Sequence, residues 1–122
     1  MILADTTIWI DHFRVPNDEL RNLLDTEEIV MHPFIVAELA LGSLGQRTKT
    51  LQALDDLPAL QVARLEEVRI MIESHCLCRR GIGLIDAHLI ASCLLHPSTL
   101  LWTKDKRLSN VASELRIAAS LS

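Results

Sequence analysis

One stretch decides the fold of this chain: residues 1–10, which read Met1-Ile2-Leu3-Ala4-Asp5-Thr6-Thr7-Ile8-Trp9-Ile10. The first four residues are apolar and predict a short buried strand. An acid and two hydroxyl residues follow, and the apolar residues at positions 8, 9, 10 and 13 predict a helix that starts at Asp5 or Thr6 and extends to Phe13. A short buried strand that passes directly into a helix is typical of an α/β fold.

The rest of the chain repeats this alternation. Further strands are predicted over 28–32 and 99–102, with short strands over 60–63 and 117–119. Helices are predicted over 18–24, 33–41, 48–57, 65–80, 84–95 and 104–111, with Pro33 in a first turn and Gly42 as a stop signal. The pattern therefore indicates a single α/β domain over residues 1–122 with a short, mostly parallel central sheet.

Composition narrows the class of protein. The chain has 122 residues, of which 49% are hydrophobic, so it has the size of one domain and is not intrinsically disordered. It has no apolar run of the roughly 18–20 residues that a membrane-spanning helix needs, and its first residues lack the basic region of a secretory signal. Three cysteines do not make a disulfide framework. We therefore expect a soluble, cytoplasmic protein with reduced thiols and no membrane partner.

The formal net charge of −4 argues against a simple nucleic-acid-binding module, which usually has a strongly basic face. It does not exclude an enzyme that meets a phosphate backbone through bound metal cations and a local basic patch. Candidates for such a patch lie close in sequence to two acids, Asp86 and Asp105. They are Arg79, Arg80, Lys104, Lys106 and Arg107.

Four of the sixteen acids have apolar neighbours: Asp5, Glu38, Asp86 and Asp105. An ionised carboxylate that is buried without a partner is strongly unfavourable, so these acids need solvent or a shared counter-charge. Asp5 and Asp105 follow predicted strands, and open α/β sheets bind ligands beyond the carboxyl ends of their strands. If Glu38 and Asp86 converge there, the pocket gathers like charges that divalent cations make tolerable. Carboxylate oxygens suit Mg²⁺ or Mn²⁺.

Each of these acids also has an ordinary structural explanation. Asp5 and Asp105 suit the N-caps of the helices that follow them. Glu38 could lie on an exposed helix face, and Asp86 could be an acid that the helix dipole favours in a first turn. Taken one at a time, the residues leave both readings open, and their joint pattern favours a shared site.

Four motifs resemble those of the PIN-domain family, in particular its VapC-type toxins from bacterial toxin–antitoxin pairs. In chain order they are Leu3-Ala4-Asp5-Thr6-Thr7-Ile8-Trp9-Ile10, Pro33-x-x-Val36-Ala37-Glu38-Leu39-x-x-Gly42, Gly83-Leu84-Ile85-Asp86-Ala87-x-x-Ile90-Ala91 and Leu101-Trp102-Thr103-x-Asp105-x-x-Leu108. Each motif is weak alone, but together they cover nearly the whole chain. The resemblance implies a PIN-like three-layer α/β/α fold and a Mg²⁺-dependent endoribonuclease, with Mn²⁺ as a second candidate metal.

The resemblance also implies roles for residues and partners. The family's acidic quartet falls on Asp5, Glu38, Asp86 and Asp105 as metal ligands and catalytic residues, with Asp105 binding a second metal or orienting a water. Its hydroxyl positions fall on Thr6 and Thr103, which would hydrogen-bond these carboxylates or their waters. From the residues alone, Thr6 suits a helix cap and Thr103 a strand end equally well. The implied partners are an RNA of the tRNA or rRNA class, a cognate VapB-type antitoxin and a second copy in a homodimer.

Other classes of protein fit less well. A receiver-like phospho-acceptor domain would have an acid pair after its first strand and a central strand-end aspartate, and this chain has neither. A non-catalytic binding protein on the same fold stays open as an alternative. His75-Cys76-x-Cys78 lacks the ligand spacing of zinc sites, and Cys93 suits the core. His88 follows Asp86 by two residues, so on a helix it is expected to point elsewhere.

Overall fold

Three parallel strands form the centre of the molecule in the computed structural model, which describes residues 1–121. The central strand β1 (Ile2–Ala4) lies between β2 (Ile29–Val30) and β3 (Leu100–Trp102). It pairs in parallel with both, with Leu3 opposite Val30 and Ala4 opposite Trp102. The predicted short parallel sheet is thus confirmed.

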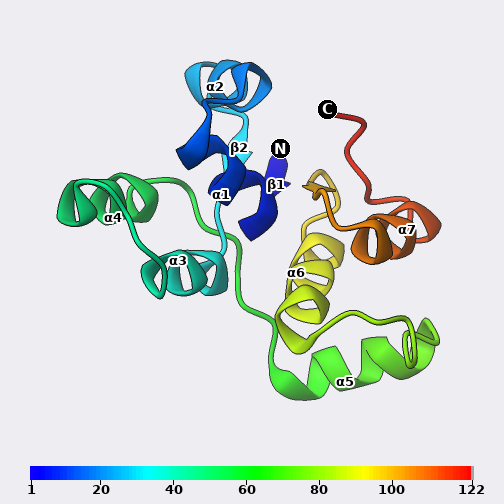
Figure 1. Cartoon of the computed structure of the whole chain (residues 1–122). Coiled ribbons are helices and arrows are strands. Elements are labelled where there is room, and N and C mark those ends of the chain that lie inside the picture. Colours follow the sequence, from blue (N-terminus) through cyan, green and yellow to red (C-terminus); the bar gives the residue numbers. More distant parts are fainter. Residues whose placement is uncertain (122) are drawn as a thin grey trace.

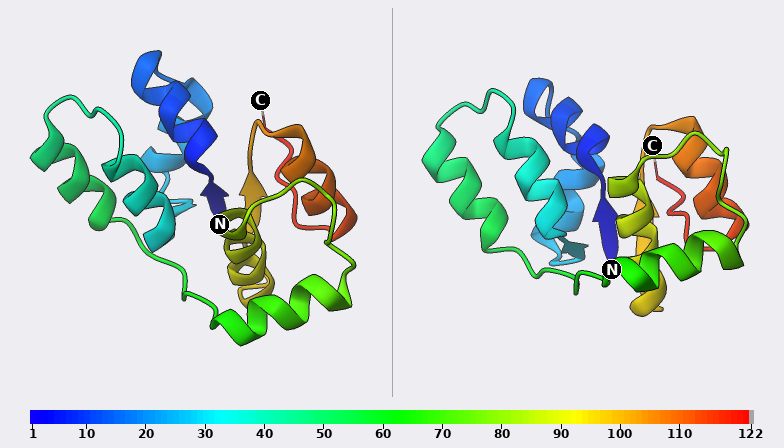
Figure 2. Two further views of the ribbon diagram at one scale, coloured as in Figure 1. Left: turned by 60° about the horizontal axis from the view of Figure 1, so that its bottom comes forward. Right: turned by 90° about the horizontal axis from the view of Figure 1, so that it is seen from below.

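Helices cover both faces of this sheet. They are α1 (Thr6–Arg14), α2 (Asp18–Asp25), α3 (Pro33–Ala40), α4 (Arg47–Asp55), α5 (Leu65–Ser74), α6 (Leu84–Leu95) and α7 (Lys106–Glu114). In Figure 1, α1 to α4 lie on one side of the strands and α5 to α7 on the other, and the views in Figure 2 show the same division. The fold is the expected three-layer α/β/α arrangement. Within residues 1–121, no helix has the length and apolar character needed to cross a membrane.

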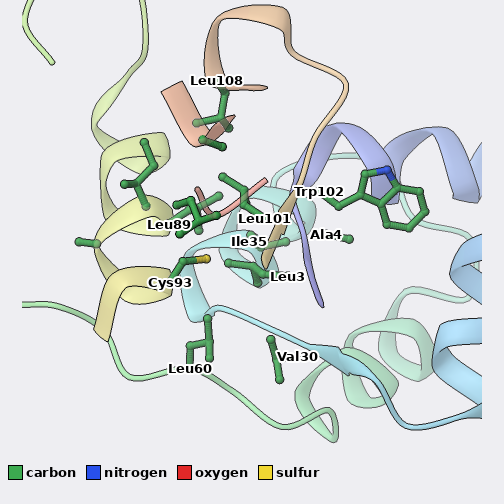
Figure 3. Close-up of a cluster of buried hydrophobic side chains, with 14 of the residues drawn as sticks. Leu3, Ala4, Val30, Ile35, Leu60, Leu89, Cys93, Leu101, Trp102 and Leu108 are labelled. Carbon is green, nitrogen blue, oxygen red and sulfur yellow. The ribbon is translucent and has the colours of Figure 1, made fainter. Parts of the chain in front are cut away.

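The core lies between the sheet and the helices that cover it, as the close-up in Figure 3 shows. Leu3 and Ala4 of the central strand have no exposed surface. All residues from 87 to 93 of α6 are buried, so this helix lies deep in the structure. Strands that are covered on both faces are continuous apolar runs in sequence rather than alternating ones, which is why Met1-Ile2-Leu3-Ala4 could be recognised.

The register of the strands brings distant parts of the chain together at the carboxyl end of the sheet. Asp5 follows β1 directly, and its backbone N–H donates to the carbonyl oxygen of Trp102 over 2.9 Å. Because Trp102 is the last residue of β3, Thr103 leaves the sheet beside Asp5. This edge therefore carries two of the predicted site residues.

The helix predicted over 65–80 is wrong in its second half, because α5 ends at Ser74. Cys76 adopts a left-handed conformation with φ 54°, and the N–H groups of Cys76 and Leu77 donate back to the carbonyls of Glu73 and Ile72. This is a Schellman ending in which a non-glycine residue takes the left-handed position. It turns Leu77 into the core, where it is 5% exposed. The apolar spacing continued past Ser74 and gave no sign of this turn.

The short strand predicted over 60–63 does not form, and the one predicted over 117–119 is reduced to a single bridge. Met31 pairs with Ala59, just before the predicted strand over 60–63, and Leu101 pairs with Ala118 within the predicted 117–119 segment. Both segments are too short and too irregular to extend the ladder. The helix predicted over 104–111 begins at Lys106 and continues to Glu114, because Asp105 caps it.

The buried His32 lies after β2 and links this strand to α3 and α6 through hydrogen bonds. Its Nδ1 accepts the N–H of Phe34 over 3.0 Å, which caps α3. Its Nε2 lies 3.1 Å from Oγ of Ser92, and that hydroxyl donates to the carbonyl of Gln61 over 2.8 Å. With Nδ1 accepting and Ser92 donating onward, Nε2 must carry the proton. Burial, reinforced by the neighbouring His88, lowers the pKa of His32 to about 4.

We expect this histidine to make the fold sensitive to acid. The unfolded chain takes up a proton near pH 6.5 and the folded chain only near pH 4, so stability is lost as pH falls between these values. Between pH 7 and pH 5 the expected loss is about 2 kcal/mol. His32→Asn, which keeps a capping side chain, should show a correspondingly smaller loss in urea unfolding at the two pH values. Equal losses in the variant and the natural protein would contradict this role.

Candidate active site

Asp5 is the buried centre of the candidate site and is only 4% exposed. It is the N-cap of α1, and its Oδ1 accepts the N–H of Ile8 over 3.3 Å and the hydroxyl of Thr7 over 2.5 Å. Its Oδ2 accepts the hydroxyl of Thr103. Burial raises the pKa of Asp5, and the hydrogen bonds from Thr103, Thr7 and the backbone oppose this rise without cancelling it. The fold thus holds the Asp5 carboxylate in a buried position where its negative charge is unfavourable.

Glu38 reaches the same edge from α3. This helix begins with Pro33, whose lack of an N–H costs nothing at that position, and packs against α1. Thr6 at the start of α1 donates its hydroxyl to Oε1 of Glu38 over 2.7 Å. The half-buried Glu38 is therefore tied to the residue next to Asp5. The alternative in which Thr6 caps α1 is wrong, because Asp5 takes that position.

Asp86 lies in the first turn of α6 on the opposite side of the strands. Its Oδ2 accepts the N–H of Gly83 at 3.4 Å, so it is also a capping acid. Burial raises the pKa of Asp86, and the negative charges of Asp5, Asp105 and Glu38 raise it further. The charges of acids from three other motifs thus reach Asp86, which places the four acids around a common space. This electrostatic coupling is the feature that distinguishes them from the other acids.

Asp105 is the most exposed of the four acids and has a second structural role. Its Oδ1 accepts the N–H groups of Arg107 and Leu108 over 2.8 and 3.1 Å, which caps α7. The capping explanation and the site explanation are therefore compatible for Asp5, Asp86 and Asp105 alike. A helix N-terminus at each of these places offers partial positive charge that tolerates an acid.

Thr7 belongs to this network although the sequence analysis did not assign it to the site. Its hydroxyl donates to Asp5 and accepts the N–H of Lys104 over 3.1 Å. Thr103 makes the equivalent pair of bonds, donating to Asp5 and accepting the N–H of Asp105 over 3.0 Å. The signal that could have identified Thr7 was its place two residues after an N-cap acid, where a hydroxyl can reach that acid.

An apolar groove of about 450 Å³ begins at Glu38 and extends along α1 and the end of α3. Its lining includes Ile10 and Phe13, which are 46% and 41% exposed. Leu39 and Leu44 contribute from the other side. An apolar surface is thus continuous with the acidic edge.

The donor set fits a hard divalent cation. It consists of carboxylate oxygens, and their mutual repulsion favours a cation between them. Within residues 1–121, no three Asp, Glu, His or Cys side chains lie close enough together to hold a metal as they stand. Mg²⁺ keeps several of its waters in protein sites, so carboxylates spaced more widely suit it.

The basic residues near the site have mixed surroundings. Arg80 pairs with Glu114 over 2.7 Å, and Lys104 pairs with Asp11 over 2.6 Å. Arg107 lies across the backbone of Gly81, where a Cβ would meet its Cδ at 2.7 Å. The exposed Arg79 and Lys106 form no ion pair with the described residues.

The core position predicted for Cys93 is confirmed. Cys93 is fully buried, and burial raises the pKa of its thiol to about 12. Cys76 and Cys78 are free and exposed. His88 packs edge-on against Phe34 with ring centroids 4.7 Å apart.

Comparisons with known proteins agree with this fold. The family model described as PIN domain matches residues 2–114. Two curated relatives, both named Ribonuclease VapC32, come from Mycobacterium tuberculosis strains CDC 1551 / Oshkosh and ATCC 25618 / H37Rv. Each is 40% identical over 118 residues, which cover 97% of this chain and 95% of the relative. With a family model that matches residues 2–114, relatives 40% identical over nearly the full length and a parallel three-stranded sheet, the chain belongs to the PIN domain family.

Proposed function

We propose that this protein is a divalent-metal-dependent endoribonuclease and the toxin of a toxin–antitoxin pair. The observation that carries the proposal is the coupling of Asp86 to Asp5, Glu38 and Asp105 around a buried carboxylate. Similarity along nearly the full length to proteins named Ribonuclease VapC32 supports RNA as the substrate. The proposed place of action is the cytoplasm.

In this proposal Asp5, Glu38 and Asp86 hold Mg²⁺ or Mn²⁺, and Asp105 holds a second ion or orients a water. When bound, the metal supplies an activated water and stabilises charge that develops on the phosphate and the leaving oxygen. The chain's own contribution is to hold the carboxylates ready. Thr103 fixes Asp5 and Thr6 fixes Glu38, so neither carboxylate has to reorganise when the substrate arrives.

RNA contact is proposed for the exposed cations beside the site. Arg79 and Lys106 are the first candidates because their charges are free of the ion pairs that engage Arg80 and Lys104 within the described residues. Contacts of this kind recognise the phosphate backbone and weaken with salt. The substrate is proposed to be of the tRNA or rRNA class, as the resemblance to VapC-type toxins implies.

The proposed partners are a VapB-type antitoxin and a second copy of the chain in a homodimer. The groove beside Glu38 exposes Ile10 and Phe13, and it is the proposed binding surface for an inhibiting segment of the antitoxin. A segment bound there would lie next to the acidic edge and would block access of RNA to it.

Metal removal tests the enzymatic part of the proposal. The purified protein, freed from any antitoxin, should cleave total RNA at discrete positions with Mg²⁺ or Mn²⁺, and cleavage should stop in excess EDTA and return when metal is added. Cleavage products are mapped by primer extension. Undiminished cleavage in EDTA would contradict metal dependence. Binding of RNA without cleavage at any metal concentration would favour the non-catalytic binding protein instead.

A further inference from the structure

We infer that Thr7 is a positioning residue that fixes the Asp5 carboxylate so that Oδ2 is the oxygen more open to a metal ion. The inference rests on the proposed function, since it concerns how Asp5 meets that ion. It assigns a role to a residue outside the acidic quartet and outside the hydroxyl positions Thr6 and Thr103.

The direction of the Thr7 hydrogen bonds follows from their partners. The backbone N–H of Lys104 can only donate, so Oγ1 of Thr7 accepts it over 3.1 Å. An ionised carboxylate can only accept, so the single hydroxyl proton of Thr7 goes to Oδ1 of Asp5 over 2.5 Å. The same reasoning places the proton of Thr103 on Oδ2, because that hydroxyl accepts the N–H of Asp105. Neither hydroxyl can rotate without losing a bond.

The hydrogen bonds to Asp5 are distributed unequally between its two oxygens. A carboxylate has about four lone-pair positions, two on each oxygen. Oδ1 accepts the Thr7 hydroxyl and the N–H of Ile8, whereas Oδ2 accepts the Thr103 hydroxyl. Oδ2 is therefore the oxygen of Asp5 that is more open to a cation.

Thr7 also connects Asp5 to the loop between β3 and α7, which carries Asp105. Lys104 holds this loop to α1 at two points. Its N–H donates to Thr7, and its ammonium group pairs with Asp11 over 2.6 Å. Removing the Thr7 hydroxyl therefore takes one of the two bonds from Oδ1 of Asp5 and one of the two Lys104 contacts from the loop.

The test measures metal affinity rather than cleavage alone. Mn²⁺ binding to the full chain is followed by electron paramagnetic resonance for the natural protein, Thr7→Val and Thr7→Ser. We expect Thr7→Val to bind Mn²⁺ about tenfold more weakly and Thr7→Ser, which keeps the hydroxyl, to stay within about twofold of the natural protein. Cleavage by Thr7→Val should recover when Mn²⁺ is raised to saturation.

Thr26→Val is the matched control. The Thr26 hydroxyl also donates to a carboxylate over 2.5 Å, that of Glu28, whose backbone carbonyl accepts from Ile2 at the opposite end of β1. This variant loses a hydroxyl–carboxylate bond on an exposed surface away from the site, so its Mn²⁺ affinity should not change. If Thr7→Val does not fold by circular dichroism, Thr7→Ala gives the same comparison without the added methyl group.

The outcomes separate this inference from the proposed function. Unchanged Mn²⁺ affinity in Thr7→Val or Thr7→Ala, or equal weakening in Thr7→Ser, would overturn the positioning role. If the natural protein binds no Mn²⁺, the metal dependence itself fails, and the inference fails with it. Weakening confined to the variants without a hydroxyl supports both.

Discussion

Asp5→Asn is expected to slow RNA cleavage by about 10³-fold or more, because losing a metal-binding charge removes several kcal/mol of stabilisation from the transition state. Asp5 is the most buried of the four acids, and solvent cannot replace its charge. The asparagine side chain has the same shape, so α1 keeps a capping residue and the fold should persist. The measurement is single-turnover cleavage of a labelled RNA at saturating Mg²⁺, with thermal unfolding followed in parallel.

Asp25→Asn is the control for this prediction. Asp25 lies exposed at the end of α2 and is not among the charges that act on Asp86. The control variant should cleave at the natural rate. If Asp5→Asn also cleaved at that rate, Asp5 would have no part in metal binding, and the proposed site would lose its centre.

Much of the fold could be predicted because its signals are local. The apolar run before Asp5 and the apolar run before Thr103 mark strands that are buried on both faces, and Pro33 and Gly42 mark the two ends of a helix. The end of α5 could not be predicted, because Cys76 takes a left-handed conformation that favours glycine. The reason lies in tertiary structure, since the turn brings Leu77 into the core.

The site residues, like the elements of the fold, could be predicted only where their signals are local. That Asp5 and Asp105 lie at one edge follows from two parallel strands whose carboxyl ends meet there. The spacing of Glu38 and Asp86 within their helices does not reveal that they face this edge, and resemblance to a family supplied that expectation. Thr7 shows the limit most clearly, because its partner Lys104 is 97 positions away in sequence. Only the folded chain brings that amide to the hydroxyl.

Asp86→Asn is expected to weaken cleavage strongly and, in metal-free buffer, to stabilise the fold. Asp86 is half-buried, and three other acids oppose its charge, while the N-terminus of α6 and one long hydrogen bond from Gly83 support it. Removing the charge should therefore raise the free energy of unfolding by on the order of 1 kcal/mol, or roughly 4 °C in Tm. Thermal unfolding in EDTA measures the change.

Glu67→Gln is the matched control because Glu67 holds the same position in α5 as Asp86 holds in α6. It accepts the N–H of the N-cap residue Arg64 over 2.9 Å, and its partly exposed carboxylate also pairs with the exposed Arg64 side chain over 3.4 Å. Its charge favours a helix N-terminus and is not opposed by the coupled acids. Glu67→Gln should thus leave stability unchanged or lower it by a few tenths of a kcal/mol. The opposite signs of the two variants would separate cluster repulsion from the loss of a capping acid.

Added Mg²⁺ should raise the stability of the folded chain, because a ligand that binds only the folded state stabilises it. The natural protein should gain Tm with Mg²⁺, since the cation offsets the repulsion that destabilises the metal-free form. Asp86→Asn should gain less, so the two melting curves should approach or cross as Mg²⁺ increases. If Asp86→Asn were less stable than the natural protein in EDTA, the four acids would not repel one another in the folded chain. Their coupling would then no longer support a shared metal site.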